Sequence, residues 1–343
     1  MANMTYRFFS NLIRRLVCLE AIILLFSIPI FCIAQDSTNN NLVHQEDYKL
    51  SKAGDIPYFT KKGKGSQTII LIPGCGFDAS VFNDFMEANK KHYQMYAITI
   101  PGYGNTMAQA MPPAGTSYGK QSWNSAVVEG LIKLIKKENL NRPIIAGHFV
   151  QGTQLALRMA IDHPEHVGGV IILGGPAKFI AIVNGKPQEF PLNNSISYVD
   201  NYTAPKWFKT ITKEAFDQGN YLPIVYSMDS TIGTQLWTQS ASIPLPVMIQ
   251  YLCEFFASDI KLELQKIKCP VLVLRAGFND KVLNDPINNY LKPQFIDSWN
   301  DTPSKNSLIR IIDVPNAASF VWKDNPDKVF TDLLRFLKEI NLR

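Results

Sequence analysis

The chain has 343 residues, with 34 Lys and Arg against 29 Asp and Glu, which gives a net charge of +5 near neutral pH. This length is enough for a large core and is typical of one large domain or two smaller ones. Such a mild positive excess argues against a dedicated nucleic-acid surface. Beyond the N-terminal region, Cys75, Cys253 and Cys269 have irregular spacing. They predict neither a disulfide framework nor a zinc site, although one bridge stays open in an oxidising compartment.

The first 34 residues have the pattern of an export signal. Three arginines precede a largely apolar run, "LVCLEAIILLFSIPIFCIA", which ends at the small residue Ala34. A charged start, an apolar centre and a small residue before a polar stretch predict a signal peptide, residues 1–34. It would be removed on export to the periplasm or to the outside of the cell. The alternative is a retained membrane anchor, because about 18 apolar residues can span a bilayer, but Glu20 interrupts this run.

A polar linker, residues 35–46, leads into a chain in which apolar runs alternate with amphipathic segments. Two short strand-like runs come first, separated by a turn at Gly54 and Asp55. The later runs that predict buried strands lie within residues 68–74, 95–104, 143–147, 168–175, 269–280 and 307–322. The segments with helical spacing are 79–92, 121–138, 152–159 and 325–340. This alternation predicts crossover connections and a mostly parallel sheet flanked by helices, which is an α/β fold.

Residues 179–258 interrupt the alternation. They are rich in aromatic residues and prolines and contain no strong buried strand. An insertion of this kind between two strands predicts a helical cap over the carboxyl edge of the sheet, where ligands bind in open α/β sheets. The alternative is a set of packing helices that has no role in access to a site.

Five short motifs follow one another along the rest of the chain: "LIPGCGFD", "ITIPGYGNT", "AGHFVQG", "LRAGFND" and "VPNAASFVW". In this order they resemble five landmarks of the α/β-hydrolase superfamily: the oxyanion loop, a loop in which the family has Asp, Pro-Gly and Gly, the nucleophile elbow, the strand that carries the catalytic acid, and the loop that carries the catalytic histidine. Pro73 and Thr99 depart from the histidine and aspartate that the family has at those positions. The resemblance implies an α/β-hydrolase fold, with residues 47–178 and 259–343 as its core and 179–258 as its cap.

The resemblance also assigns positions to the catalytic groups of that family, in which a histidine activates a serine and a carboxylate orients the histidine. The acid is present as Asp280, and the backbone donors of the oxyanion hole would be Cys75 and Val150. The nucleophile position, however, holds Phe149, and the histidine position holds Ser319. Two of the three catalytic groups are therefore substituted.

The loss of the histidine does not depend on the alignment. The family places histidine last in chain order, yet no histidine follows His166 in this sequence. The elbow departs a second time at Gln151, where the family has glycine, and this puts its strained geometry in doubt. A triad of the usual order cannot be assembled.

Two other residues, Ser117 and Cys75, could in principle act as a nucleophile in place of the missing serine. Ser117 lies in a second G-x-S-x-G match, "GTSYG", but no strand enters it, so we expect a loop or the start of a helix. Cys75 could attack only as a thiolate. The candidate base is His148, which strand alternation points to the face opposite Phe149. A small buried cysteine is the preferred interpretation.

The remaining polar candidates also have structural interpretations. Without a histidine partner, Asp280 is expected to be a solvated loop carboxylate or a hydrogen-bond acceptor for Ser319. His163 and His166 follow the elbow helix and are expected to be surface turn residues, because their spacing has no third metal ligand of matching context. We expect no metal and no cofactor.

The leading hypothesis is an exported pseudoenzyme that binds a small apolar or amphipathic molecule. Its pocket would be walled by Phe149, Val150, Ser319, Phe320 and aromatic residues of the cap. We expect no nucleic-acid partner and, after signal cleavage, no membrane partner. Two alternatives stay open: a hydrolase of an ester or amide bond that uses Asp280, Cys75 and a bound water, and a protein-interaction module with a vestigial pocket.

Overall fold

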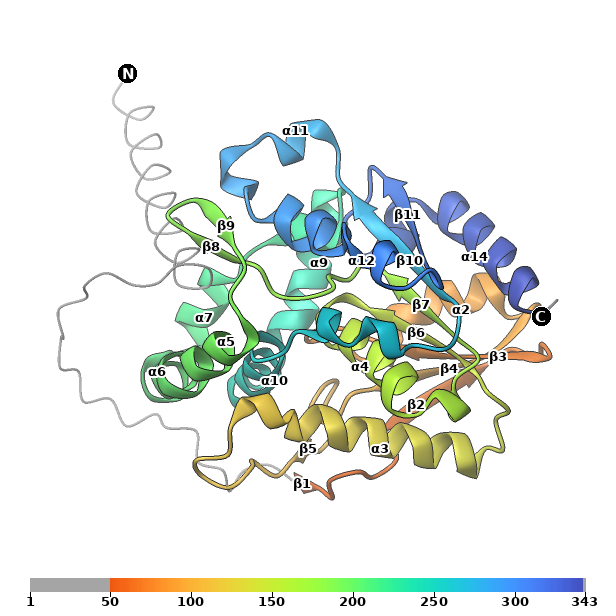
Figure 1. Cartoon of the computed structure of the whole chain (residues 1–343), viewed down its shortest axis with the longest axis horizontal. Coiled ribbons are helices and arrows are strands. Elements are labelled where there is room, and N and C mark those ends of the chain that lie inside the picture. Colours follow the sequence, from red (N-terminus) through yellow and green to blue (C-terminus); the bar gives the residue numbers. More distant parts are fainter. Residues whose placement is uncertain (1–49, 342–343) are drawn as a thin grey trace.

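A central sheet of seven strands organises residues 50–341, the part of the chain that this computed structural model describes (Figure 1). The predicted signal peptide and the whole predicted linker, residues 35–46, lie outside these residues. In spatial order the strands are β11 (Ile309–Pro315), β10 (Val271–Gly277), β7 (Gly169–Leu173), β6 (Ile144–His148), β3 (Gln67–Ile72), β4 (Tyr93–Thr99) and β2 (Tyr58–Lys62). All neighbours are parallel except β2 and β4. The predicted α/β class with a mostly parallel sheet is confirmed.

Helices cover both faces of this sheet, which explains why its inner strands are apolar without alternation. On one face lie α3 (Ser122–Lys137) and α4 (Phe149–Asp162), which pack against each other. On the other lie α2 (Asn83–Asn89) and α14 (Pro326–Asn341), joined by the rings of Phe85 and Phe330 at 5.5 Å (Figure 1). Between these layers β6 and β7 are buried along their full length.

The two expected N-terminal strands are present: β1 (Leu50–Ser51) pairs with β5 (Ala108–Gln109), and β2 pairs with β4. One element prediction differs from the structure. Helix α4 begins at Phe149 and not near residue 152. The reason is that the chain turns within one residue at the end of β6, so that the helix starts directly after the strand.

The segment between β7 and β10 forms the cap. It opens with a small hairpin, β8 (Ala181–Val183) and β9 (Lys186–Gln188). It continues with α5 (Leu192–Tyr198), α6 (Ala204–Thr210), α7 (Lys213–Gly219), α8 (Pro223–Tyr226), α9 (Ser230–Ala241) and α10 (Leu245–Phe256). The short helices α11 (Asp280–Leu283), α12 (Thr302–Lys305) and α13 (Val321–Asp324) complete the core. The cap helices gather at one end of the sheet in Figure 1.

An ion pair joins the two ends of the cap segment. Nζ of Lys178, where the chain leaves the core, lies 2.7 Å from Oδ2 of Asp259, where it returns, and both side chains are almost completely buried. A buried charge needs its partner, because removing one ion leaves the other without compensation in a poorly solvated site. This pair therefore links the two chain segments at which the cap begins and ends.

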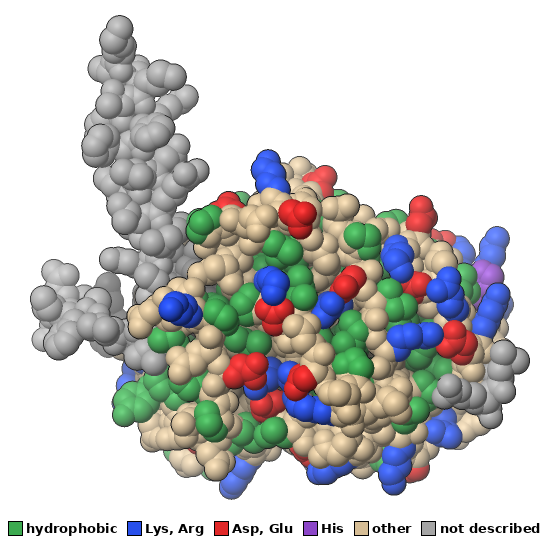
Figure 2. All heavy atoms as spheres, turned by 45° about the horizontal axis from the view of Figure 1, so that its top comes forward, with side chains coloured by type: hydrophobic (Ala, Val, Ile, Leu, Met, Phe, Trp, Pro, Cys, Tyr) green, Lys and Arg blue, Asp and Glu red, His purple; other side chains and the backbone are tan. Residues whose placement is uncertain are grey.

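The surface carries charges of both signs. On the face seen in Figure 2, basic and acidic side chains are interspersed, and no continuous basic patch crosses that face. Within residues 50–341, none of the helices has the length and apolar character needed to span a bilayer.

Candidate functional site

The turn between β6 and α4 keeps the strained backbone of a nucleophile elbow. Phe149 has φ +54°, in the left-handed region that residues with a Cβ seldom adopt. The elbow geometry is therefore retained although Gln151 stands where the family has glycine. A bulky aromatic residue at a positive φ costs free energy, so the surrounding structure must hold it there.

Two glycines make room for this turn. A Cβ atom added to Gly74, in the loop after β3, would lie 2.3 Å from Cβ of Phe149. A Cβ atom added to Gly152, in the first turn of α4, would lie 2.4 Å from the carbonyl oxygen of Ile72. Either substitution would force the backbone apart, so these residues bring the loop after β3 against the start of α4.

The Phe149 side chain fills the position in which the family presents a hydroxyl. Its ring lies parallel to that of Phe295, with centroids 6.0 Å apart, and meets the ring of Tyr226 at 69° and 5.7 Å. Only 7% of the residue is exposed. Contacts with the cap and with the segment after β10 therefore fix the ring from two sides.

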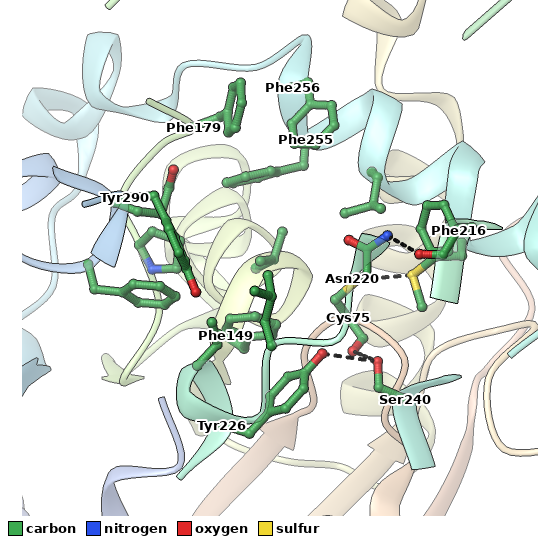
Figure 3. Close-up of a pocket in the computed structure, with 18 residues that line it drawn as sticks. Cys75, Phe149, Phe179, Phe216, Asn220, Tyr226, Ser240, Phe255, Phe256 and Tyr290 are labelled. Carbon is green, nitrogen blue, oxygen red and sulfur yellow. Dashed lines mark hydrogen bonds between the residues drawn. The ribbon is translucent and has the colours of Figure 1, made fainter. Parts of the chain in front are cut away.

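Phe149 also lines a cavity of about 130 Å3 between the core and the cap (Figure 3). Its walls are mostly aromatic and aliphatic, and no Asp, Glu, Lys, Arg or His lines it; the side chains include Phe179, Phe216, Leu222, Val225, Tyr226, Leu252, Phe255, Phe256 and Phe295. A charged ligand would lose its hydration there without gaining a partner of opposite charge. The cavity therefore suits a neutral molecule.

The two residues at the oxyanion positions, Cys75 and Val150, both line this cavity. Val150 is in the first turn of α4, whose N–H groups have no partner within the helix. The two residues at the oxyanion positions thus lie at the cavity, although Phe149 supplies no attacking hydroxyl.

Ser319 and Phe320 do not line the cavity, contrary to the prediction. Both are fully buried, because the cap seals the loop that contains them. Their N–H groups donate to the carbonyl oxygens of Val225 (3.0 Å) and Tyr226 (3.1 Å), respectively. The Ser319 hydroxyl oxygen has no hydrogen-bond partner within residues 50–341. The position at which the family has its catalytic histidine is therefore closed off behind the cavity wall.

Asp280 is exposed at the first residue of α11. It does not accept a hydrogen bond from the Ser319 hydroxyl, so of its two expected roles the structure favours the solvated carboxylate. The acid position is occupied, but the carboxylate orients no base.

His148 lies beside Phe149 and not on the opposite face, which corrects the prediction from strand alternation. The two rings are stacked, with centroids 5.8 Å apart, and the rings of Phe320 and Trp322 enclose the imidazole at 4.2 and 4.9 Å. Alternation fails here because the left-handed turn at Phe149 ends the strand. Burial lowers the pKa of His148 well below its ordinary value, so the imidazole is neutral.

Cys75 is a buried thiol, as expected. Its Sγ donates to Sδ of Met248 at 3.1 Å, and burial raises its pKa to about 12. A thiol with that pKa supplies almost no thiolate at neutral pH. Cys253 and Cys269 are likewise buried and unpaired, so none of the three described cysteines forms a disulfide.

The remaining sequence candidates have structural roles. The Gln151 amide donates to the carbonyl oxygen of Tyr251 (2.9 Å) and so joins α4 to α10. Ser117 caps a short 3₁₀ turn by accepting from the N–H of Gly119, which confirms the expected helix start. His163 follows α4 and precedes a 3₁₀ turn, Pro164–His166, of which His166 is the last residue. Within residues 50–341, no cluster of three or more His, Cys, Asp or Glu is arranged to hold a metal.

Sequence reasoning identified the aromatic cap residues as a group but missed the one polar side chain that matters most in the cavity wall. Asn220 lines the cavity just after α7, and its Nδ2 donates to the carbonyl oxygen of Phe216 at 2.7 Å. Nothing in the local sequence distinguishes it from a solvated turn asparagine, because its position depends on the contact of this turn with α9, where Nε1 of Trp237 donates to the carbonyl oxygen of Asn220 at 2.9 Å.

Comparisons with known proteins agree with this architecture. No protein-family model matches the chain. MenH from S. aureus superimposes with a TM-score of 0.61 at 15% identity, over 82% of this chain and 98% of MenH. The enol-lactonase from Burkholderia xenovorans LB400 gives a TM-score of 0.57 at 14% identity, over 82% of this chain and 93% of the lactonase. The chain is an α/β-hydrolase-fold protein.

Curated relatives match this α/β-hydrolase-fold protein over a shorter stretch. The pimeloyl-[acyl-carrier protein] methyl ester esterase of Yersinia enterocolitica is 23% identical over 124 residues, which are 36% of this chain and 42% of the esterase. The (E)-2-((N-methylformamido)methylene)succinate hydrolase of Acinetobacter baylyi is 26% identical over 130 residues, 38% of this chain and 45% of the hydrolase. Each match spans less than half the length of the relative. Their names describe hydrolases, but the nucleophile position of this chain holds Phe149.

Proposed function

We propose that this protein is a pseudoenzyme that binds a small neutral, apolar molecule between its core and its cap. The observation that carries the proposal is Phe149: the elbow backbone is retained at φ +54°, but it presents an aromatic ring to the cavity. Aromatic surface gives a ligand apolar contact, whereas it cannot attack a carbonyl carbon.

The surroundings of Phe149 support binding over catalysis. Ser319 stands at the histidine position and is sealed behind the wall, and the exposed Asp280 orients no base. The nearest imidazole, that of His148, is neutral and enclosed by rings. General-base activation of a nucleophile needs a group within hydrogen-bond reach that can accept its proton, and the cavity wall offers none.

A hydrolase with a non-standard site is the alternative that the names of the relatives favour. It would rely on Asp280, Cys75 and a bound water. The raised pKa of Cys75 and its contact with Met248 oppose a thiolate mechanism.

A protein-interaction module is the second alternative, and the size of the cavity favours it. About 130 Å3 is below the range of roughly 300 Å3 and above that is usual for sites of drug-sized ligands. The binding proposal therefore requires a ligand no larger than about one ring.

The test of catalysis is an assay against a panel of activated esters and labelling with a serine-reactive phosphonate. We expect no turnover and no labelling of the unmodified protein. The matched control is Phe149→Ala, which removes the ring without adding a nucleophile; Phe149→Ser and the double variant Phe149→Ser, Ser319→His restore the missing groups. Turnover by the unmodified protein that Asp280→Ala or Cys75→Ala abolishes would refute the binding-only proposal.

The test of binding is calorimetry with small neutral aromatic compounds. We expect saturable binding to the unmodified protein and weaker binding to Leu252→Trp, in which a larger side chain fills the cavity. Absence of binding by every compound, with the protein folded, would favour the interaction module.

Export is part of the same proposal. The arginines and apolar run of residues 1–34 support removal of this segment at Ala34. Intact-mass measurement of protein recovered from outside the cytoplasm should show a chain that begins at residue 35. A full-length chain recovered with the membrane fraction would instead support the anchor.

A further inference from the structure

One polar atom in the wall of the cavity is left without a partner. Nδ2 of Asn220 donates to the carbonyl oxygen of Phe216 at 2.7 Å. Because a carbonyl oxygen only accepts, this bond fixes which end of the amide is nitrogen. The Oδ1 atom is then directed toward the cavity (Figure 3) and accepts no hydrogen bond from residues 50–341.

Two neighbouring polar side chains of the wall, Ser240 and Gln294, already bond to the protein. The Ser240 hydroxyl donates to the carbonyl oxygen of Cys75 (3.3 Å) and accepts from the Tyr226 hydroxyl (3.4 Å). The Gln294 amide donates to the carbonyl oxygen of Lys178 and accepts from the N–H of Ile180. Asn220 therefore offers an acceptor that the protein itself does not use, next to aromatic surface.

We infer that the ligand of this cavity is a neutral molecule of one-ring size that carries a hydroxyl or N–H group, which donates to Oδ1 of Asn220. This inference rests on the proposed binding function and specifies its ligand class. A hydrogen-bond acceptor in an apolar site selects for a donor, because a ligand without one leaves the acceptor desolvated and unpaired.

The volume and charge of the cavity set the other limits on the ligand. An apolar protein cavity of about 150 Å3 holds benzene, so about 130 Å3 limits the ligand to about the size of one ring. No ionisable Asp, Glu, Lys, Arg or His lines the wall, which excludes carboxylates and ammonium ions. Phenol, anisole and toluene are therefore suitable probes: they share one ring, and only phenol has a donor.

The test measures the dissociation constants of the three probes by calorimetry, with benzoate as a charged comparison. A net hydrogen bond to a neutral acceptor corresponds to a preference of about three- to tenfold. We expect phenol to bind tighter than anisole by that factor, and benzoate not to bind. The comparison of phenol with anisole in the unmodified protein needs no substitution, so it stands even if a variant fails to fold.

The variant Asn220→Leu should bring the affinity ratio of anisole to phenol close to one. Loss of the bond to Phe216 affects both probes equally and so leaves the ratio unchanged. The matched control is Asn201→Leu, because Nδ2 of Asn201 also donates to the carbonyl four residues earlier, that of Ser197 at 2.8 Å, but Asn201 does not line the cavity. This control should keep the ratio of the unmodified protein.

The outcomes separate the two proposals. Equal affinities for phenol and anisole, or a ratio that Asn220→Leu leaves unchanged, would overturn the donor inference while the binding function stands. If none of the three neutral probes binds the folded protein, both the ligand class and the binding function are wrong.

Discussion

Phe149 provides a direct measure of the strain in the elbow. Replacing it with Ala or with Gly removes the same buried ring, at a shared cost of about 3–5 kcal/mol. The two variants differ in the backbone: a residue with a Cβ at φ +54° costs about 1–2 kcal/mol that glycine avoids. Glycine in turn loses about 0.5–1 kcal/mol in chain entropy. We expect Phe149→Gly to be as stable as Phe149→Ala, or up to about 1.5 kcal/mol more stable.

The assay is urea unfolding of both variants, beside a matched pair at Leu155. Leu155 is also fully buried in α4 but lies within the regular helix. There the order should reverse, with Leu155→Ala more stable than Leu155→Gly by about 1 kcal/mol. If Ala exceeds Gly by the same margin at both positions, Phe149 is not held in a strained conformation and the elbow is not retained.

Three further predictions concern groups around the cap and cavity. Burial raises the pKa of Glu254 from 4.5 to about 7; the folded state thus holds its proton more tightly than the unfolded state. This contribution to the free energy of unfolding, about 3 kcal/mol, is present below pH 4.5 and lost as the pH rises to about 7. The melting temperature of Glu254→Gln should therefore fall less over that pH range than the melting temperature of the unmodified protein. Lys178→Met should destabilise the protein by about 3–5 kcal/mol. In a double-mutant cycle, the variant that combines Lys178→Met with Asp259→Leu should lose less stability than the sum of the two single variants. Additive losses would show that the pair does not couple the ends of the cap. Cys75 should resist iodoacetamide at pH 8 until the protein unfolds, whereas rapid labelling of the folded protein would contradict its burial.

The sequence was a good guide to features that depend on local pattern. Continuous apolar runs predicted the inner strands, and the order of the motifs predicted the fold and the position of Phe149. Helix α4 was expected three residues late, because a left-handed phenylalanine is not a signal that propensity provides. The site was less predictable. Ser319 was expected in the pocket because it stands at the family's histidine position, yet its N–H donates to the carbonyl oxygen of Val225 and the residue is fully buried behind the cap.

The error at His148 has a more general physical cause. Strand alternation predicts side-chain directions only while the backbone stays extended. Phe149, at φ +54°, ends the extended backbone directly after His148, so alternation does not predict how these two side chains lie. Asn220 was missed for a different reason: its place in the cavity wall depends on a contact with Trp237 of α9, which no spacing along the sequence reports. Local pattern therefore located the elbow, while the chemistry around it depended on tertiary contacts.

The retained strain also bears on what holds a nucleophile elbow in place when its position carries no hydroxyl. In a serine hydrolase the tight elbow is explained by the need to expose a hydroxyl, but Phe149 has none to expose. Its backbone keeps the same form because Gly74 and Gly152 permit close approach, and because Phe295 and Tyr226 pack on its ring. Burial of a phenylalanine side chain contributes about 1.5–3 kcal/mol, which is enough to offset the strain of one left-handed residue. Packing alone can thus maintain the geometry of a nucleophile elbow, so the presence of that geometry in an α/β-hydrolase-fold protein is not by itself evidence of catalysis.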